Sequence, residues 1–168
     1  GRDAKGVTDY FSLFIGCEEY TRARNDTKNL VNVTIKYCEE HELDNNRTEI
    51  AKQFVYDFCL TRLENEQPVL LENISIALDA QYLTQEPEKW GRFLEMAQDD
   101  PFFLNNEVPI EKSALKGLTR YRGFNSKMSL SFDSELLNNT VMYNESTDEL
   151  TFTEIPSALK AQLIKQQS

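Results

Sequence analysis

The spacing of apolar residues along the first hundred positions is typical of helices. Between Val7 and Ile15, apolar side chains recur three and four residues apart, a period that gathers them on one side of a helix. Gly16 follows this run and is expected to end the helix, because glycine is a frequent stop signal. We expect burial of the apolar face, which is formed by Val7, Tyr10, Phe11, Phe14 and Ile15.

The segment of residues 27–41 fits two structures. Residues 31–37 alternate between apolar and polar side chains, as a strand does, whereas Leu30, Thr34 and Cys38 are spaced as on one face of a helix. The prediction is a helix, because the threonine with which the segment begins is a good N-cap and the neighbouring segments are helical.

The widest apolar stripe belongs to a long helix that is predicted to be capped by Asn45 or Asn46 and to end near Glu64. It is expected to form the centre of the core. A further helix is predicted at residues 69–80. Pro87 is expected to open another helix. One face of this helix is expected to pack in the core rather than to form a groove for a partner, and it consists of Trp90, Phe93, Leu94 and Ala97.

From Pro101 the pattern changes to shorter elements with more turn residues. Residues 128–132 alternate between apolar side chains and serine, which predicts a strand. Residues 140–143 and 149–153 flank a turn-forming segment, as the two arms of a hairpin do. Pro156 is expected to start a last amphipathic helix.

These elements predict an α+β fold that is mainly helical. An N-terminal helical bundle is followed by a small antiparallel β-sheet with flanking helices. We place a helical subdomain at residues 1–100. A small α/β subdomain at residues 101–168 is expected to carry a basic helix and the β-hairpin.

Composition narrows the functional classes. No apolar run approaches the length of a membrane span, so a soluble protein is expected. The sequence has three cysteines and no Cys-x-x-Cys pair, and His41 is the only histidine that could join them as a metal ligand. No metal site is therefore expected at Cys17, Cys38 and Cys59. Each thiol is interpreted as a small hydrophobic group buried on a helix face, and reduced thiols fit the cytosol.

Enzyme chemistry is not indicated. The sequence has no glycine-rich phosphate loop, no Gly-x-Ser-x-Gly elbow and no His-Glu-x-x-His motif. Its paired carboxylates, such as Glu18-Glu19 and Asp99-Asp100, are adjacent and therefore point in different directions on a helix. No catalytic, metal-binding or cofactor-binding residue is predicted.

One short segment differs from the acidic remainder of the chain. The formal net charge is −10, yet the sixteen residues 112–127 hold five basic side chains and no acidic one. Their spacing suggests a short helix with three cations four residues apart on one face, and two more cations across the turn at Gly123. The ridge so formed consists of Lys112, Lys116, Arg120, Arg122 and Lys127.

This ridge has two interpretations. The five cations could pair with nearby carboxylates and only aid solubility, since surface pairs add about 0–1 kcal/mol each. Alternatively, a positive ridge on a negative body could hold a phosphate backbone in one orientation. Tyr121 and Phe124 could stack on unpaired bases, although burial is the expected use of these aromatic side chains.

Several segments carry a family resemblance through their order and spacing. They include Val108-Pro-Ile-Glu-Lys-Ser-Ala-Leu115, Leu118-Thr-Arg-Tyr121, Leu130-Ser-Phe-Asp133, Tyr143-Asn-Glu-Ser-Thr-Asp-Glu-Leu-Thr-Phe152 and, near the start, Asp9-Tyr-Phe11 and Phe14-Ile-Gly-Cys17. Together they resemble the C-terminal half of the bacterial nucleoid-associated protein family called NdpA or YejK. Residues 18–100 match it mainly in helical character.

The resemblance implies a cytoplasmic, non-enzymatic protein of the nucleoid that binds double-stranded DNA without a cofactor. It also implies that the chain is a fragment lacking an N-terminal half of similar length. We expect DNA contact largely through backbone electrostatics at the five cations. The alternative is that this half serves dimerisation or protein interaction while the other half of the protein binds DNA. The partner would then be a second copy of the chain or another nucleoid protein. No membrane partner is expected.

Overall fold

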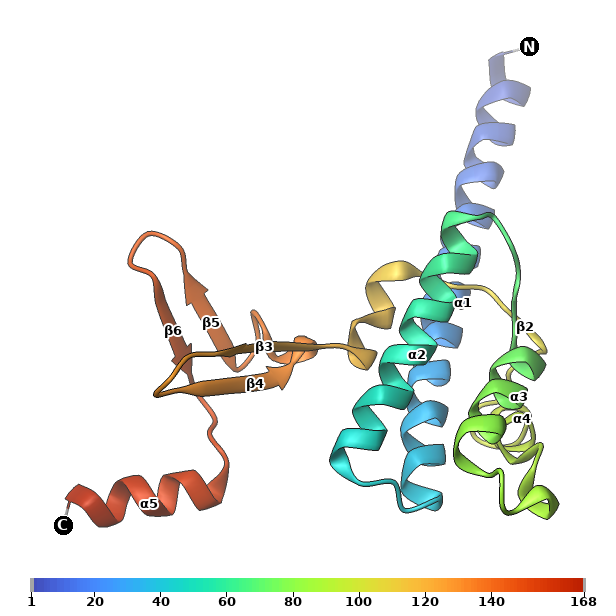
Figure 1. Cartoon of the computed structure of the whole chain (residues 1–168). Helices are drawn as coiled ribbons and strands as arrows, with labels where there is room; N and C mark the ends of the chain where they lie inside the picture. The colour runs from blue at the N-terminus through green and yellow to red at the C-terminus, as the bar shows by residue number, and fades with distance from the viewer. Residues whose placement is uncertain (1, 168) are drawn as a thin grey trace. The chain divides into compact units, whose positions relative to one another are not determined.

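The computed structural model describes residues 2–167, and their side chains from residue 13 onward (Figure 1). It contains two units, Gly1–Thr119 and Arg120–Ser168. The fold is α+β and mainly helical, as predicted. The unit boundary after Thr119 lies inside the basic stretch. The division into a helical subdomain at residues 1–100 and a small α/β subdomain at residues 101–168 stays a prediction.

Helix α1 (Arg2–Glu40) is one continuous element of 39 residues. The prediction of a helix at residues 27–41 is confirmed, but the predicted stop at Gly16 is wrong. A glycine inside an exposed helix costs only about 1 kcal/mol, and propagation from both sides outweighs that cost. Gly16 also has no atom within 4 Å of the place where a side chain would begin, so no packing contact interrupts the helix there.

The two halves of α1 differ in burial. Leu30, Val33 and Tyr37 are fully buried in the core of the first unit. By contrast, Phe14 and Ile15 are 51% and 53% exposed, so the predicted burial of this face is wrong for both. The side chains of Val7, Tyr10 and Phe11, which were part of the same prediction, lie outside the described side chains.

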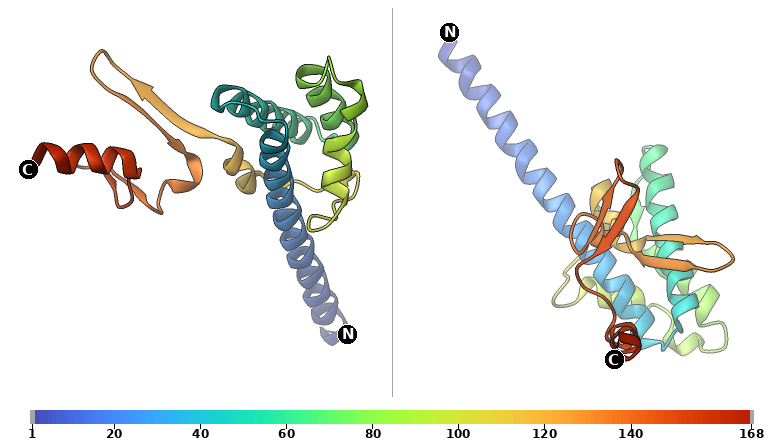
Figure 2. Two further views of the ribbon diagram at one scale, coloured as in Figure 1. Left: turned by 90° about the horizontal axis from the view of Figure 1, so that it is seen from below. Right: turned by 90° about the vertical axis from the view of Figure 1, so that its left-hand side faces the viewer.

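Helix α2 (Asn45–Glu64) confirms the long central helix, and Figure 2 shows it beside the second half of α1. Its N-cap is Asp44 and not Asn45 or Asn46, and the Asp44 carboxylate accepts a hydrogen bond of 2.8 Å from the Arg47 amide. Ala51, Val55 and Cys59 form the fully buried part of its stripe.

Helix α3 (Leu71–Tyr82) follows strand β1 (Val69–Leu70), which pairs antiparallel with β2 (Glu107–Val108). Helix α3 confirms the helix predicted at residues 69–80. The helix expected from Pro87 is broken into η1 (Pro87–Lys89) and α4 (Arg92–Gln98).

The break between η1 and α4 occurs at Gly91, whose φ of +86° is favourable only for glycine. Trp90 beside it is 45% exposed, and its indole N–H donates a hydrogen bond of 2.8 Å to the Leu83 carbonyl. The prediction of core packing is therefore wrong for Trp90 and confirmed for Phe93 and Ala97, which are fully buried.

The first unit ends with η2 (Lys112–Leu118), a 3₁₀ helix that packs against α1 and α2. The second unit contains two separate antiparallel hairpins, β3 with β4 and β5 with β6 (Figure 2). Its elements in chain order are β3 (Arg120–Phe124), β4 (Ser129–Asp133), η3 (Ser134–Leu136), β5 (Val141–Asn144), β6 (Glu149–Phe152) and α5 (Ser157–Gln167). Strand β4, the β5–β6 hairpin and α5 were predicted. Strand β3 was not.

Candidate nucleic-acid interface

Lys112 and Lys116, the first two predicted cations, lie on η2 in the first unit. The Glu111 carboxylate caps its start by accepting hydrogen bonds from the Ser113 and Ala114 amides at 3.2 and 3.0 Å. The Ser113 hydroxyl also donates to this carboxylate. This bond most strongly, and the two amide bonds with it, hold the pKa of Glu111 below its usual value. Leu115 and Leu118 are buried in the core, so Lys112 and Lys116 stay exposed.

The predicted grouping of three cations on one helix face is wrong. Because η2 is a 3₁₀ helix with about three residues per turn, positions four apart do not share a face. Arg120 also lies outside η2, as the first residue of β3. Lys112 and Lys116 thus belong to the first unit, and Arg120, Arg122 and Lys127 to the second. As DNA contacts, all five stay a prediction.

The β3–β4 hairpin has two chemically different faces. Its register pairs Arg120 with Asp133 and Phe124 with Ser129, and opposed residues point to the same side of a ribbon. One side, here called the basic face, consists of Arg120, Arg122, Phe124, Ser129, Ser131 and Asp133. The other, the aromatic face, consists of Tyr121, Gly123, Leu130 and Phe132.

The aromatic face is joined to the second hairpin of the same unit. The Phe132 ring lies 5.5 Å from the ring of Tyr121, between centroids, and 6.2 Å from the ring of Phe152 on β6. Gly123 has no side chain here, which leaves a shallow hollow between Tyr121, Leu130 and Met128. The expected burial is wrong for Tyr121, which is 48% exposed.

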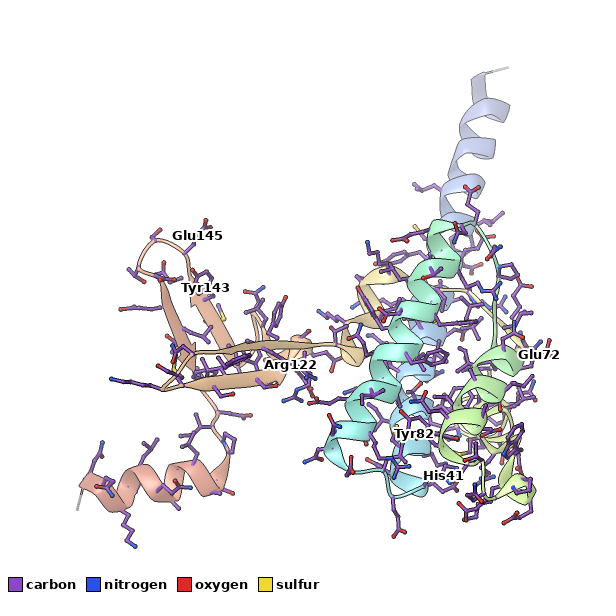
Figure 3. All side chains as sticks on the ribbon, viewed as in Figure 1. His41, Glu72, Tyr82, Arg122, Tyr143 and Glu145 are labelled. Carbon is purple, nitrogen blue, oxygen red and sulfur yellow. The ribbon has the colours of Figure 1, made fainter. Side chains whose placement is uncertain are left out.

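The basic face is exposed at Arg122, which projects from β3 (Figure 3), and at both serines. Arg120 is instead held in place, because its guanidinium forms an ion pair with Asp133 and its Nε donates to the Ser131 hydroxyl at 3.0 Å. Within residues 13–167, no ion pair is formed by Lys112, Lys116 or Lys127. The expected pairing with carboxylates is therefore found for Arg120 but not for these three lysines.

The tip of this hairpin is closed by hydrogen bonds. The Asn125 side-chain carbonyl accepts from the amides of Lys127 and Met128, both at 2.9 Å, and the Asn125 amide donates to the Met128 carbonyl at 2.8 Å. Phe124 precedes this turn with its side chain 89% exposed. Expected burial is wrong here too. The two serines beside this ring are features that sequence reasoning missed.

A period-two signal for this face was present in the sequence. Arg120, Arg122 and Phe124 alternate along β3, and Ser129 and Ser131 alternate along β4. The prediction of a helix through Arg120 concealed the first half of that pattern.

Formal charge is distributed unevenly between the two units. The unit Gly1–Thr119 has 13 basic and 22 acidic residues, whereas Arg120–Ser168 has 5 and 6. Within the β3–β4 hairpin the only carboxylate is Asp133, at its base. The repulsion of a polyanion by this acidic chain therefore comes almost entirely from the first unit.

Two further structural findings concern the described part of the chain. Its side chains form no group of three or more His, Cys, Asp or Glu residues placed to hold a metal ion. None of its helices combines the length and the apolar character that crossing a membrane requires.

A basic, exposed hairpin face is of the kind that contacts polyanions. Residues 1–160 match the model of the family described as nucleoid-associated protein YejK, so the chain belongs to this family. Similar proteins named nucleoid-associated protein occur in Glaesserella parasuis (29% identity over 97% of this chain), Haemophilus influenzae strain PittGG (31% over 98%) and Azotobacter vinelandii (31% over 97%). The chain covers 47%, 47% and 46% of these relatives, about half their length.

Proposed function

We propose that this chain binds double-stranded DNA, without catalysis, in the nucleoid of the bacterial cytoplasm. The observation that carries the proposal is the basic face of the β3–β4 hairpin. Arg122, Phe124 and the two serines of this face are exposed, and its only carboxylate is already paired with Arg120. Arg122 and Lys127 are the residues of this hairpin assigned to phosphate contacts. Membership of a nucleoid-associated family supports the same partner.

The contacts are assigned to the phosphate backbone rather than to base edges. Arg and Lys side chains and hydroxyl groups are the usual partners of phosphate oxygens, and such contacts carry no sequence information. Ser129 and Ser131 add hydroxyl donors beside the cations. Lys112 and Lys116, which lie on η2, are assigned to further contacts with DNA phosphates. The acidic remainder of the first unit then limits how the chain can approach DNA.

The experiment measures binding of a fluorescent duplex by anisotropy at several salt concentrations. Removal of one cation that touches a phosphate should lower the slope of log affinity against log salt by about one. We expect a fall of about two for Arg122→Gln with Lys127→Gln, and a similar fall for Lys112→Gln with Lys116→Gln.

The matched control changes the same amount of charge on α5 of the second unit, through Lys160→Gln with Lys165→Gln. Its slope should equal that of the unmodified chain. An equal fall in the control, or no binding by the unmodified chain, would overturn the proposal.

A second function, dimerisation through α1, is favoured by a separate observation. Leu13, Phe14, Ile15 and Tyr20 are all more than half exposed, an unusual density of apolar side chains on one helix. Light scattering should show a concentration-dependent dimer that Phe14→Glu abolishes. The control Ile76→Glu places the same charge on α3, at a residue of similar exposure (59%), and should leave the mass unchanged.

A further inference from the structure

Phe124 combines three properties that are seldom found together. Its ring is 89% exposed, the highest exposure among the large apolar side chains described. It lies on the basic face, two residues from Arg122 and directly opposite Ser129. It is also the last residue of β3, immediately before the turn that carries Lys127. A single exposed aromatic residue needs no explanation, but one at the end of a cationic ribbon has a specific chemical use.

The hairpin fixes the backbone position from which this ring projects. Five consecutive residue pairs join β3 to β4, ending with the pair Phe124–Ser129. Beyond that pair, the Asn125 side chain accepts two amide hydrogen bonds and so closes the turn. The contact of Phe132 with Phe152 fixes the aromatic side of the ribbon to the second hairpin of the unit. An apolar group held on a rigid ribbon can enter a stack of base pairs without losing much conformational freedom.

We propose that the β3–β4 hairpin lies in a groove of the DNA and that Phe124 inserts between two adjacent base pairs, kinking the duplex. The inference rests on the proposed DNA binding and specifies its geometry. Proteins that deform DNA insert apolar side chains, phenylalanine among them, between base steps from the minor groove. Arg122 and Lys127 lie on either side of Phe124 in the chain, where they can neutralise the phosphates that flank the opened step.

Charge complementarity selects DNA as the occupant of this surface. The acid-free stretch extends from Lys112 to Phe132, so Phe124 and the turn after it lie in a part of the sequence without acidic residues. Two copies of this chain that met tip to tip would bring like charges together and repel. A base stack provides apolar faces for the ring and a phosphate on each side for the cations.

Insertion has a consequence for DNA preference. The step that opens should be one that unstacks easily, such as a pyrimidine–purine step. A mismatch removes part of the unstacking cost in advance, so a mismatched duplex should bind more tightly than its matched counterpart.

The test uses one duplex of about 30 base pairs labelled at both ends, with anisotropy for binding and energy transfer between the labels for bending. Phe124→Ala removes the ring, and Phe124→Leu keeps an apolar wedge. Phe103→Ala is the matched control, because Phe103 is another exposed phenylalanine (68%) outside the hairpin. Since Phe124 is almost fully exposed, the thermal unfolding of the alanine variant should equal that of the unmodified chain.

The unmodified chain, Phe124→Leu and Phe103→Ala should all shorten the end-to-end distance and prefer a centrally mismatched duplex several-fold. Phe124→Ala should bind with an unchanged salt slope, lose most of the bending and lose the mismatch preference. Binding by the unmodified chain without bending, or equal bending by Phe124→Ala, would overturn the insertion and leave the proposed DNA binding standing. Flat anisotropy for the unmodified chain would overturn both. A change in molecular mass caused by Phe124→Ala would assign the ring to a protein contact instead.

Discussion

The Tyr37 hydroxyl donates a hydrogen bond of 3.0 Å to Oδ1 of Asp79 in the buried core of the first unit. Tyr37 is fully buried and Asp79 is 1% exposed, and the second carboxylate oxygen accepts a hydrogen bond of 2.7 Å from the Gly91 amide. Burial and the neighbouring carboxylate both raise the pKa of Tyr37, so it remains a donor at any physiological pH. Asp79 therefore joins α1 to the break between η1 and α4.

Tyr37→Phe should lower the free energy of unfolding by about 1–3 kcal/mol, because it leaves a buried carboxylate oxygen without a partner. Urea denaturation measures this change. The control is Tyr82→Phe, which removes a hydrogen bond of 3.2 Å to the Arg47 carbonyl at an exposed site. That variant should lose less than about 1 kcal/mol. Equal losses in the two variants would contradict the role assigned to burial.

Thr27 provides a second test, because its hydroxyl links α1 to the segment before η2. Thr27 Oγ1 donates to the Ala23 carbonyl at 2.6 Å and accepts from the Glu111 amide at 2.9 Å. Thr34 is equally buried, but its Oγ1 bonds only within α1, to the Leu30 carbonyl at 2.8 Å.

Thr27→Val should cost about 1–3 kcal/mol of unfolding free energy because the Glu111 amide loses its acceptor. Thr34→Val should cost less than about 1 kcal/mol, since the carbonyl that it leaves is already part of a helical hydrogen bond. Urea denaturation of both variants decides the point. A larger loss for Thr34→Val would show that the bond to Glu111 contributes little.

Much of the helical unit could be predicted because its residues obey a local period. The stripe on α2 and the spacing of Leu30, Thr34 and Cys38 placed these elements correctly. The continuity of α1 through Gly16 could not be predicted in this way. Whether a glycine ends a helix depends on whether the chain beyond it has somewhere else to pack, which is tertiary information.

The candidate site was predicted in composition but not in geometry. The cations were found from charge alone, yet Arg120 and Arg122 were placed on a helix and a turn, whereas both lie on β3. The segment Arg-Tyr-Arg-Gly-Phe is short, and Gly123 within it resembles a stop signal, so its strand character depends on pairing with β4. The exposure of Phe124 follows from that pairing and could not be deduced before the register was known.

The ion pair between Glu40 and Arg92 should make stability depend on pH. The Arg92 guanidinium donates to both carboxylate oxygens at 2.9 Å and holds the pKa of Glu40 below its usual value. A carboxylate with a lowered folded pKa stabilises the protein fully above its ordinary pKa, and this contribution is lost as pH falls through the folded value. Both side chains are more than a third exposed, so the contribution is small.

Glu40→Gln should therefore lose less than about 1 kcal/mol at pH 7, and the difference from the unmodified chain should shrink as pH falls from about 5 to 3. Thermal unfolding at a series of pH values measures both. Glu39→Gln, one residue earlier and exposed, provides the charge-matched control. A difference that grows toward low pH would contradict the assigned sign.

The three cysteines should react very differently with a thiol reagent in the folded protein. Cys17 is exposed, which corrects the expectation that all three are buried, whereas Cys38 and Cys59 are buried as expected. Burial raises the pKa of Cys38 to about 11 and that of Cys59 to about 12, so very little reactive thiolate forms at pH 8.

Titration with a chromogenic disulfide should release about one equivalent rapidly in native buffer and three in denaturant. Cys17→Ser should remove the rapid phase and leave two thiols that react only on unfolding. A rapid phase of two or three equivalents in native buffer would mean that the helical core opens readily.

The ion pair of Arg120 with Asp133 leads to a prediction about DNA affinity. Asp133 is the only carboxylate of the β3–β4 hairpin and partly neutralises its basic face. Asp133→Asn removes one negative charge and keeps a side chain of the same shape beside Arg120. If this face contacts phosphates, the variant should bind duplex DNA more tightly, and the slope of log affinity against log salt should steepen by up to about one.

The control for this variant is Glu145→Gln in the turn of the β5–β6 hairpin, which makes the same charge change in the same unit (Figure 3). A general gain in attraction would affect both variants equally, because long-range charge acts regardless of position. A gain confined to Asp133→Asn would require a phosphate close to Arg120. Anisotropy titrations with both variants at low and moderate salt separate the two cases, and an unchanged slope for Asp133→Asn would exclude Arg120 from the DNA-binding surface.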